Sequence, residues 1–321
     1  MWVLAAFRLP LTRLRPGRMA PARSDGYART RKGPTRMTAT RLDEDFTSSV
    51  HVYEPHRAGL PRFAPYFKEL WRRRQFASEL SRATMHSANT DTVFGQLWLI
   101  LNPLLLAAVY FVLVTILRSG SSGPEFFVHL VAGLFAYYYF SGAMQAGASS
   151  VVGGGRLLLN TSFPRMLLPL SAVRTAFFRF LPTLIVYFPI HLIMGQTVHW
   201  EMFAALYFLA ALTVFATGMA MFFATLQVYF RDTTTFLPYF VRIWLYLSPV
   251  LWYPEDVPER FQSLMVLNPL YSMLGGWGDL LVRGDVPQLS LWVGAAVWAV
   301  LALVVGGLFF MSREREFAVR L

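Results

Sequence analysis

The 321-residue chain is 55% hydrophobic and only 15% charged, with a mean hydropathy of +0.43, which is typical of a membrane protein rather than of a soluble globular domain. It contains no cysteine, so disulfides, thiolate metal sites and a catalytic thiol are excluded. The net charge of +11 is uneven: residues 1–96 hold 17 Lys and Arg against 8 Asp and Glu, whereas residues 97–321 hold 12 against 10. A basic head beside an apolar body fits the positive-inside rule for a cytoplasmic flank, and we favour this over nucleic-acid binding.

Residues 1–62 are expected to form a basic, mostly disordered cytoplasmic segment, because residues 1–36 are rich in Arg, Pro and Gly and show no apolar periodicity. Either Met37 is the natural start or residues 1–36 are an unstructured basic arm. Residues 63–95 predict an amphipathic helix followed by a connector, since Phe67, Leu70 and Trp71 share one helical face. We expect this helix to lie in the plane of the cytoplasmic leaflet.

Residues 96–321 predict an all-α, polytopic membrane domain with six transmembrane helices, each an apolar run close to the ~20 residues that cross a bilayer. The stretch Phe261–Val282 is interrupted by Asn268-Pro269 and Gly275-Gly276, so it predicts short re-entrant or gate helices at the outer side before the last span. An even number of spans and arginine-rich inside loops predict that both termini are cytoplasmic. The six predicted spans are residues 97–117, 126–146, 170–194, 203–226, 236–252 and 289–311.

Candidate chemistry is sparse along the chain. Neither lysine follows a glycine, so a Walker-type nucleotide site is excluded, and the histidines form no metal-binding motif, so we expect no metal or other cofactor in this chain. Three arginines, Arg174, Arg179 and Arg242, fall within predicted spans. A guanidinium at that depth can bind a phosphate bidentately or can snorkel to the leaflet surface. Snorkelling is the stronger interpretation for Arg174, and Arg179 and Arg242 are the candidates for a phosphate contact.

Aromatic residues make up 16% of the chain and cluster in the second and fifth predicted spans. A helix turns 100° per residue, so the run Tyr137–Phe140 cannot all face lipid, and one or two of its rings must point into the protein. Aromatic faces in a pore suit sugars, which stack on rings without demanding exact register. The candidate lining residues are Tyr138, Tyr139, Phe140, Trp244, Tyr246, Trp252 and Tyr253.

Five motifs in order resemble one family, the membrane subunits of type-2 ABC exporters for polysaccharides, which include O-antigen, teichoic-acid and cell-wall galactan exporters. The similarity covers roughly Phe63 to the C-terminus. The motifs are FGQLWLILNPLL (94–105), NTSFPRMLLPLSAV (160–173), YFRDTTTFLP (229–238), LSPVLWYPEDVP (247–258) and LNPLY (267–271).

This resemblance implies a permease subunit in the cytoplasmic membrane that forms a homodimer and binds two copies of a separate ATPase subunit, which holds the ATP and Mg. It implies that the loop before the third span is the main coupling element, with a secondary contact at Arg231 and Asp232, although Asp232 could instead only cap the fifth span. The apolar residues of the first loop independently favour a protein partner. The coupling candidates in that loop are Arg156, Asn160, Phe163, Pro164 and Arg165, and those of the outer gate are Asn268, Pro269, Tyr271 and Trp277.

The implied substrate is a glycan on a polyprenyl diphosphate carrier, and a contact between Arg179 or Arg242 and that diphosphate is a hypothesis drawn from the residues. Only two of the 29 basic residues are lysines, a bias typical of GC-rich genomes, which favours the galactan of an actinobacterial cell wall. Two alternatives stay open: a type-2 ABC permease for drugs or small lipids, and a membrane enzyme acting on polyprenyl lipids. The enzyme is less favoured because no Asp or Glu falls within the six predicted spans.

Overall fold

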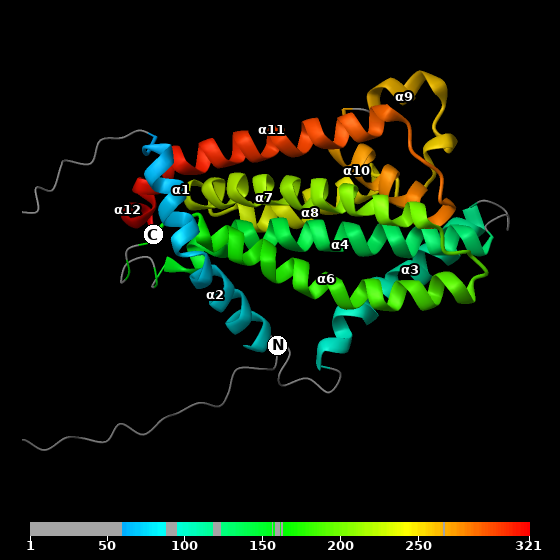
Figure 1. Ribbon diagram of the computed structural model, residues 1–321, viewed down its shortest axis with the longest axis horizontal. Helices are drawn as coiled ribbons and strands as arrows, with labels where there is room; N and C mark the ends of the chain where they lie inside the picture. The colour runs from blue at the N-terminus through cyan, green and yellow to red at the C-terminus, as the bar shows by residue number, and fades with distance from the viewer. Residues whose placement is uncertain are drawn as a thin grey trace, which may run out of the picture. The chain divides into compact units, whose positions relative to one another are not determined.

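The structure is a computed structural model that describes residues 60–87, 95–117, 123–155, 157, 161, 163–265 and 267–321 (Figure 1). All of these residues belong to one structural unit, Glu54–Leu321. Every regular element within the described ranges is helical. The α-helices are α1 (Phe63–Arg72), α2 (Arg74–Ser87), α3 (Trp98–Leu117), α4 (Pro124–Gly153), α6 (Leu167–Ile193), α7 (Ala205–Tyr229), α8 (Thr233–Tyr246), α9 (Glu259–Met265), α10 (Pro269–Gly278), α11 (Leu289–Arg313) and α12 (Phe317–Arg320). Single-turn 3₁₀ or π elements are η1 (Gly95–Leu97), η2 (Trp200–Ala204), η3 (Pro254–Asp256), η4 (Asp279–Arg283) and η5 (Glu314–Glu316).

Five helical segments of the described chain are long and apolar enough to cross a membrane. They correspond to the predicted spans 97–117, 126–146, 170–194, 203–226 and 289–311, and most extend a few residues beyond the predicted bounds. The five segments are Trp98–Leu117, Pro124–Gly153, Leu167–Ile193, Trp200–Tyr229 and Leu289–Arg320.

The predicted span 236–252 differs in the structure, because α8 ends at Tyr246 and is only 14 residues long. At 1.5 Å per residue, α8 is about 21 Å long, which is shorter than the hydrocarbon core of about 30 Å. The residue before a proline avoids the helical conformation, and Ser248 precedes Pro249, so the helix stops and turns begin. The helix of this span therefore ends at Tyr246, before the predicted end of the span at residue 252.

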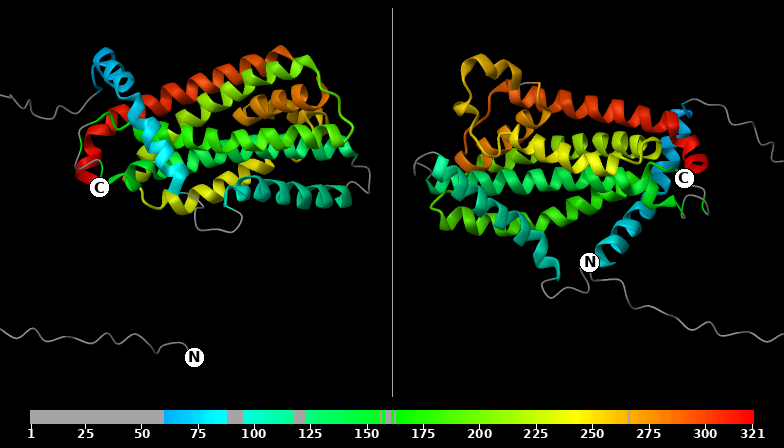
Figure 2. Two further views of the ribbon diagram at one scale, coloured as in Figure 1. Left: turned by 60° about the horizontal axis from the view of Figure 1, so that its bottom comes forward. Right: turned by 180° about the vertical axis from the view of Figure 1, so that it is seen from behind.

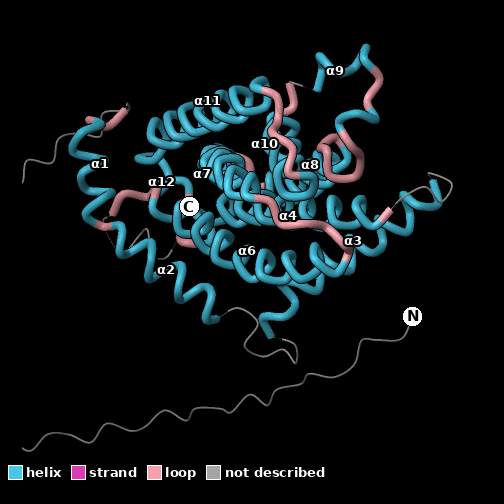
Figure 3. The backbone as a smooth tube through the Cα atoms, turned by 45° about the vertical axis from the view of Figure 1, so that its right-hand side comes forward, coloured by secondary structure: helices cyan, strands magenta, loops and turns pink. Residues whose placement is uncertain are grey.

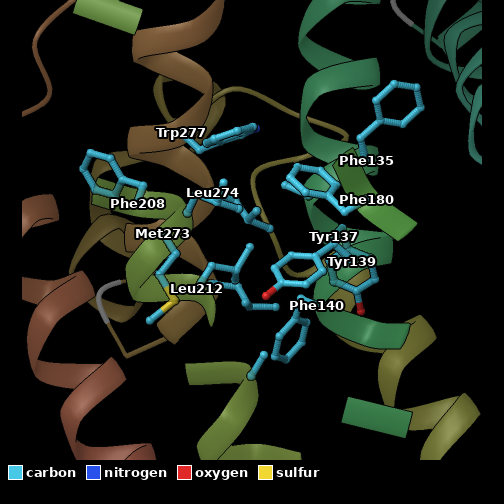
Figure 4. Close-up of a cluster of buried hydrophobic side chains, with 14 of the residues drawn as sticks. Phe135, Tyr137, Tyr139, Phe140, Phe180, Phe208, Leu212, Met273, Leu274 and Trp277 are labelled. Atoms are coloured by element: carbon cyan, nitrogen blue, oxygen red, sulfur yellow. The ribbon is translucent and has the colours of Figure 1, made fainter. Parts of the chain in front are cut away.

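Helices α4 and α7 form the centre of the bundle, and α3, α6, α8, α10 and α11 surround them (Figure 3). Most of α4 is buried, although its sequence is no more apolar than that of its neighbours. Aromatic and aliphatic side chains of α4, α6, α7 and α10 fill the space between the helices, as the cluster around Tyr137, Phe140 and Trp277 illustrates (Figure 4). Burial by protein rather than by lipid therefore explains why α4 carries tyrosines and glycines at membrane depth.

Glycines set the distance between α7 and α11. A Cβ added at Gly218 would overlap the backbone of Ala302, and one added at Gly306 would overlap the backbone of Gly218. By contrast, a Cβ added at Gly307 would meet only the methyl group of Met221, at 3.8 Å. The close approach of the two backbones thus depends on Gly218 and Gly306, as is common where membrane helices pack.

Substituting valine for Gly306 is expected to destabilise the protein by at least about 1–3 kcal/mol, the usual cost of overpacking, because the clash is with backbone that cannot rotate away. Thermal unfolding in detergent measures the effect. Gly307→Ala on the same helix turn is the matched control and should leave the melting temperature nearly unchanged. Equal melting temperatures for both variants would show that α7 and α11 do not pack as described.

The amphipathic helix predicted within residues 63–95 is broken in two at Arg73, which lies between α1 and α2. Glu69 forms ion pairs with both Arg72 and Arg73 at the break. Helix α2 packs against α6, where Ser81 is fully buried and its hydroxyl lies 2.9 Å from that of Thr175. The break allows α2 to contact the bundle.

Candidate functional site

Tyrosines from three helices gather around one arginine on the outside of the bundle. Tyr239, Arg242 and Tyr246 share one face of α8 by their spacing and are exposed, the two tyrosines by 63% and 50%. Tyr110 of α3 lies edge-on to Tyr246, with the two hydroxyl oxygens 3.5 Å apart. The charge of Arg242 acts on both Tyr110 and Tyr138 of α4. We call these five residues the aromatic face.

The aromatic face is costly to expose to lipid. An arginine at bilayer depth and exposed phenol hydroxyls both lose hydration that hydrocarbon cannot replace. Such groups therefore face either a water-filled path or a polar protein partner. Tyr138 and Tyr246 belong to the predicted lining residues, and the structure places them beside Arg242 on this face.

Three other predicted lining residues point into the bundle. The hydroxyl of Tyr139 donates a hydrogen bond of 2.9 Å to Thr213, and Phe140 is fully buried and stacks on Phe215 with ring centroids 5.5 Å apart. Trp244 packs edge-on against Phe140 at 5.4 Å. In this single chain, Tyr139, Phe140 and Trp244 hold α4, α7 and α8 together.

Asn268, a predicted gate residue, joins the end of α8 to the start of α10. Its side-chain oxygen accepts hydrogen bonds from Trp244 Nε1 at 2.8 Å and from the backbone N–H of Leu270 at 3.2 Å, so it caps α10. Its amide nitrogen donates to the carbonyl of Leu247 at 2.7 Å. Pro269 occupies the first position of α10, where a missing N–H costs nothing. Asn268 and Pro269 therefore fix the turn between the two helices.

The remaining predicted gate and lining residues differ in how deeply they are buried in the protein. Trp252 stacks on Tyr271 with ring centroids 6.4 Å apart, and both side chains are partly exposed. Tyr253 lies under the guanidinium of Arg283 at 4.5 Å. Trp277 is buried, and its Nε1 donates to the carbonyl of Ala132 at 3.1 Å.

A cluster of charged groups surrounds Arg283 at the same end of the bundle. Arg283 forms ion pairs with Glu125 at 3.0 Å and with Glu255 at 2.9 Å, which joins the start of α4 to η3 and η4. Burial, reinforced by the nearby charge of Glu255, raises the pKa of Asp279 from 3.8 to about 6. Asp279 therefore changes charge in a mildly acidic medium.

The raised pKa of Asp279 predicts how stability depends on pH. Between pH 3.8 and about pH 6 the folded state binds the Asp279 proton more tightly than the unfolded state, so the stability it contributes is present at low pH and is lost as pH rises through this window. Asp279→Asn should remove this loss and be more stable than the native protein above pH 6. Melting temperatures of both proteins across pH 4–8 test it, and parallel curves would contradict it.

At the opposite end of the bundle, Glu314 joins three segments of the chain. Its carboxylate, in a residue only 8% exposed, accepts a hydrogen bond of 2.6 Å from the hydroxyl of Tyr66 in α1. The same carboxylate accepts the backbone N–H of Arg165, and the guanidinium of Arg165 donates to the carbonyl of Glu314. Burial and the charge of Glu314 raise the pKa of the Tyr66 phenol far above its ordinary value, so Tyr66 remains a hydrogen-bond donor.

The predicted main coupling loop is held between α2 and this acidic residue. Phe163 packs against Phe76 of α2 with ring centroids 4.8 Å apart, and Pro164 is buried. Arg156 and Asn160, two further predicted coupling residues, lie outside the described residues.

The secondary loop is joined to the same C-terminal segment through a second acid. The hydroxyl of Tyr229 donates a hydrogen bond of 2.5 Å to Glu316, and the guanidinium of Arg320 lies 4.2 Å from the Tyr229 ring centre. Arg231 and Asp232 are exposed, and the Asp232 side chain makes no capping hydrogen bond to α8. We call Glu314–Leu321 the C-terminal clasp, since it contacts the main coupling loop and the end of α7. Figures 1 and 2 show α12 and α1 at the same end of the bundle.

The two candidate phosphate-binding arginines lie in different places. Arg242 is on the aromatic face, whereas Arg179 lines a cavity of about 590 Å³ between α2, α3, α4 and α6, which we call the α6 groove. Arg179 forms no hydrogen bond or ion pair with the described residues. Arg174 is exposed on α6 and lies 5.2 Å from the Phe178 ring centre.

The sequence analysis missed several residues of these sites, among them Tyr66, Tyr110, Tyr239 and Glu314. Glu314 is the first acid after the last span and lies between Arg313 and Arg315, a position that suggests only a solvated charge. Tyr110 is one of three aromatic residues in an apolar span, with Trp98 and Phe111, and such residues are typical of ordinary membrane helices. Contacts between distant segments are needed to find such residues.

Comparison with known proteins matches residues 74–277 to the ABC-2 type transporter family. The O-antigen export system permease protein RfbA of Myxococcus xanthus is 27% identical over 254 residues, which cover 78% of this chain and 97% of that protein. The O-antigen export system permease protein RfbA of Klebsiella pneumoniae is 29% identical over 198 residues, which cover 61% of this chain and 76% of that protein. The matched family region includes α2, the aromatic face and the gate residues. The chain belongs to the ABC-2 type transporter family.

Proposed function

We propose that this chain is the permease subunit of an ABC transporter that exports polysaccharide across the cytoplasmic membrane. The aromatic face carries this proposal, because it presents tyrosine rings and an arginine from α3, α4 and α8 at membrane depth. Rings that stack on sugars, together with phenol hydroxyls, suit a hydroxyl-rich polymer that must slide. The relatives named as O-antigen export permeases support the same class of cargo.

The cargo that we propose is a glycan attached to a polyprenyl diphosphate carrier, with Arg179 or Arg242 as the contact for the diphosphate. Arginine meets phosphate with paired donors, and neither arginine lies in a charge-neutralising ion pair with the described residues. Within this class, the arginine-rich composition favours a cell-wall galactan of the actinobacterial type.

We propose six crossings, with α8 and the turns after it as the fifth. The end of α7 contacts the clasp through Tyr229, whereas the end of α8 contacts Asn268 at the opposite end of the bundle. Since α11 returns to the clasp, the segment between α7 and α11 crosses the bundle once more. Basic residues near the clasp support cytoplasmic termini, and the exposed Phe67 and Trp71 of α1 support its position in the leaflet surface.

We propose that two copies of the chain pair across their aromatic faces and bind two ATPase subunits, which hold ATP and Mg. Pairing would cover the polar face from lipid and enclose a path between the copies. The ATPase contacts are the loop around Phe163 to Arg165 and the loop of Arg231 and Asp232, next to the exposed Phe230. No reaction is assigned to this chain, since ATP hydrolysis belongs to the partner.

Co-purification with the ABC ATPase subunit encoded in the same gene cluster tests the proposal, followed by an ATPase assay with lipid-linked glycan. A complex of two chains and two ATPases that the glycan stimulates is the expected result. A complex that responds only to small amphiphiles would favour a permease for drugs or small lipids instead. No complex at all would contradict a coupled transporter.

A further inference from the structure

The α6 groove has a polar stripe that the aromatic face does not explain. Ser171, Thr175, Arg179 and Thr183 follow one another at intervals of four residues along α6, and all four line the groove. Groove-lining residues of α4 extend from Phe135 to Gly153. At 1.5 Å per residue, this is about 28 Å of helix, nearly the thickness of the hydrocarbon core.

Arg179 is the unusual member of this stripe. It lies near the middle of the 27-residue helix α6, without a hydrogen bond or ion pair to any described residue. Asn102 of α3 also lines the groove, and its amide likewise has no partner in the described chain. An uncompensated guanidinium at this depth is expensive, and intramembrane charges are retained where they meet a ligand or a water-filled cavity.

The rest of the groove is predominantly apolar. Leu80 and Leu157 lie at the end near the clasp, Trp98 and Leu99 of α3 form one wall, and Phe180 lies beside Arg179. Figures 1 and 2 show α2 and α3 diverging beneath α6, on the side where the groove lies. A long apolar groove with unpaired donors part of the way along it fits a molecule with a hydrocarbon chain and an anionic head.

We propose that the α6 groove binds a phosphate-headed lipid, with Arg179 and Asn102 donating hydrogen bonds to the phosphate oxygens and the apolar walls holding the hydrocarbon chain. Guanidinium and amide groups supply only donors to such a head, and phosphate supplies only acceptors. That the groove binds a phosphate-headed lipid does not depend on the proposed function. Only the identity of that lipid does: it is the polyprenyl diphosphate carrier or a phospholipid of the membrane. The groove is a separate site from the aromatic face, and Tyr138 borders both.

Photolabelling of the purified full-length chain with a diazirine-bearing polyprenyl diphosphate tests the site, with labelled peptides identified by mass spectrometry. Labelling is expected in α3, α4 and α6. Arg179→Gln should weaken binding roughly tenfold or more, the effect of losing one charge-assisted contact to phosphate. Arg179→Lys should recover part of the binding, because the charge returns without the paired donors.

Two further variants separate binding from folding. Arg174→Gln is the matched control on the same helix: its side chain is exposed away from the groove, and labelling should be unchanged. Gly142→Leu fills the groove without a clash, because a Cβ at Gly142 meets nothing within 4 Å. It should reduce labelling while the melting temperature stays close to that of the native protein.

Competition identifies the lipid. Unlabelled polyprenyl diphosphate that competes at least tenfold better than phosphatidylglycerol supports the carrier as the occupant, and equal competition supports a membrane phospholipid. Polyprenol, which has no phosphate, should compete poorly in both cases. Three results would overturn the site. They are competition by polyprenol as strong as that by polyprenyl diphosphate, labelling outside the groove, and an equal loss of labelling in Arg179→Gln and Arg174→Gln. If labelling depends on Arg179 while glycan fails to stimulate the ATPase, the polysaccharide function falls and the lipid site stands.

Discussion

Replacing Glu314 with alanine is expected to destabilise the clasp end of the bundle by about 2–6 kcal/mol, because each buried donor left without an acceptor costs about 1–3 kcal/mol. The carboxylate accepts hydrogen bonds from Tyr66 and from the backbone of Arg165, so its loss leaves both donors without an acceptor. The effect is larger than for any single surface charge, because Glu314 is buried between α1, the loop before α6 and the end of α11.

Loss of Glu314 should also uncouple ATP hydrolysis from transport, because Glu314 holds the loop that contains Phe163 to Arg165 and this loop is proposed to contact the ATPase. Glycan transported per ATP hydrolysed is expected to fall at least about tenfold, which corresponds to 1.4 kcal/mol of lost coupling. Glu314→Gln, which keeps the shape of the side chain, separates coupling from folding and should show an intermediate loss. Glu79→Ala on α2 is the control, because its exposed pair with Arg82 contributes about 0–1 kcal/mol. Native coupling in Glu314→Gln and Glu314→Ala would show that the clasp does not link the loops to transport.

The second large effect is expected on the aromatic face. The double variant Tyr110→Ala, Tyr246→Ala removes the two rings that meet across α3 and α8, and Arg242→Gln removes the charge between them. Each should reduce glycan-stimulated ATP hydrolysis about tenfold, because the loss of roughly 1.4 kcal/mol of contact with the passing polymer corresponds to a tenfold change. These side chains are exposed or half-exposed, so the variants should fold.

Phe178→Ala provides the comparison, because Phe178 is an exposed aromatic of α6 outside the aromatic face. With Phe178→Ala, glycan should stimulate ATP hydrolysis as strongly as with the native chain. Full glycan stimulation in the aromatic-face variants would place the sugar path elsewhere.

Hydropathy predicted most of the membrane domain, because a long uncharged run has no stable alternative to a helix in lipid. The predicted first span, 97–117, differs from α3 by a single residue at its start. The span 236–252 was mispredicted at its end, because its apolar composition continues past Pro249 while the helix does not. Apolar composition indicates how favourable it is to transfer a segment into lipid, whereas the end of a helix depends on backbone geometry.

The sequence could say that the run Tyr137–Phe140 must divide between inside and outside, but not which ring goes where. The structure buries three of these rings, Tyr137, Tyr139 and Phe140, rather than the one or two predicted, and leaves Tyr138 beside Arg242. That division depends on how α4 is rotated against α7 and α8, which is set by distant contacts such as Phe140 with Phe215. The clasp was missed for the same reason, since Glu314 and Arg165 are 149 residues apart.

Transport in reconstituted vesicles is the most direct measurement of the proposed function. The chain and its ATPase subunit are placed in liposomes with a fluorescent lipid-linked glycan, and the glycan that crosses is measured by its protection from an added glycosidase. ATP-dependent protection that is lost in the double variant Tyr110→Ala, Tyr246→Ala is the predicted result. Hydrolysis of ATP without any movement of the glycan, in a complex that moves a small amphiphile, would contradict polysaccharide export.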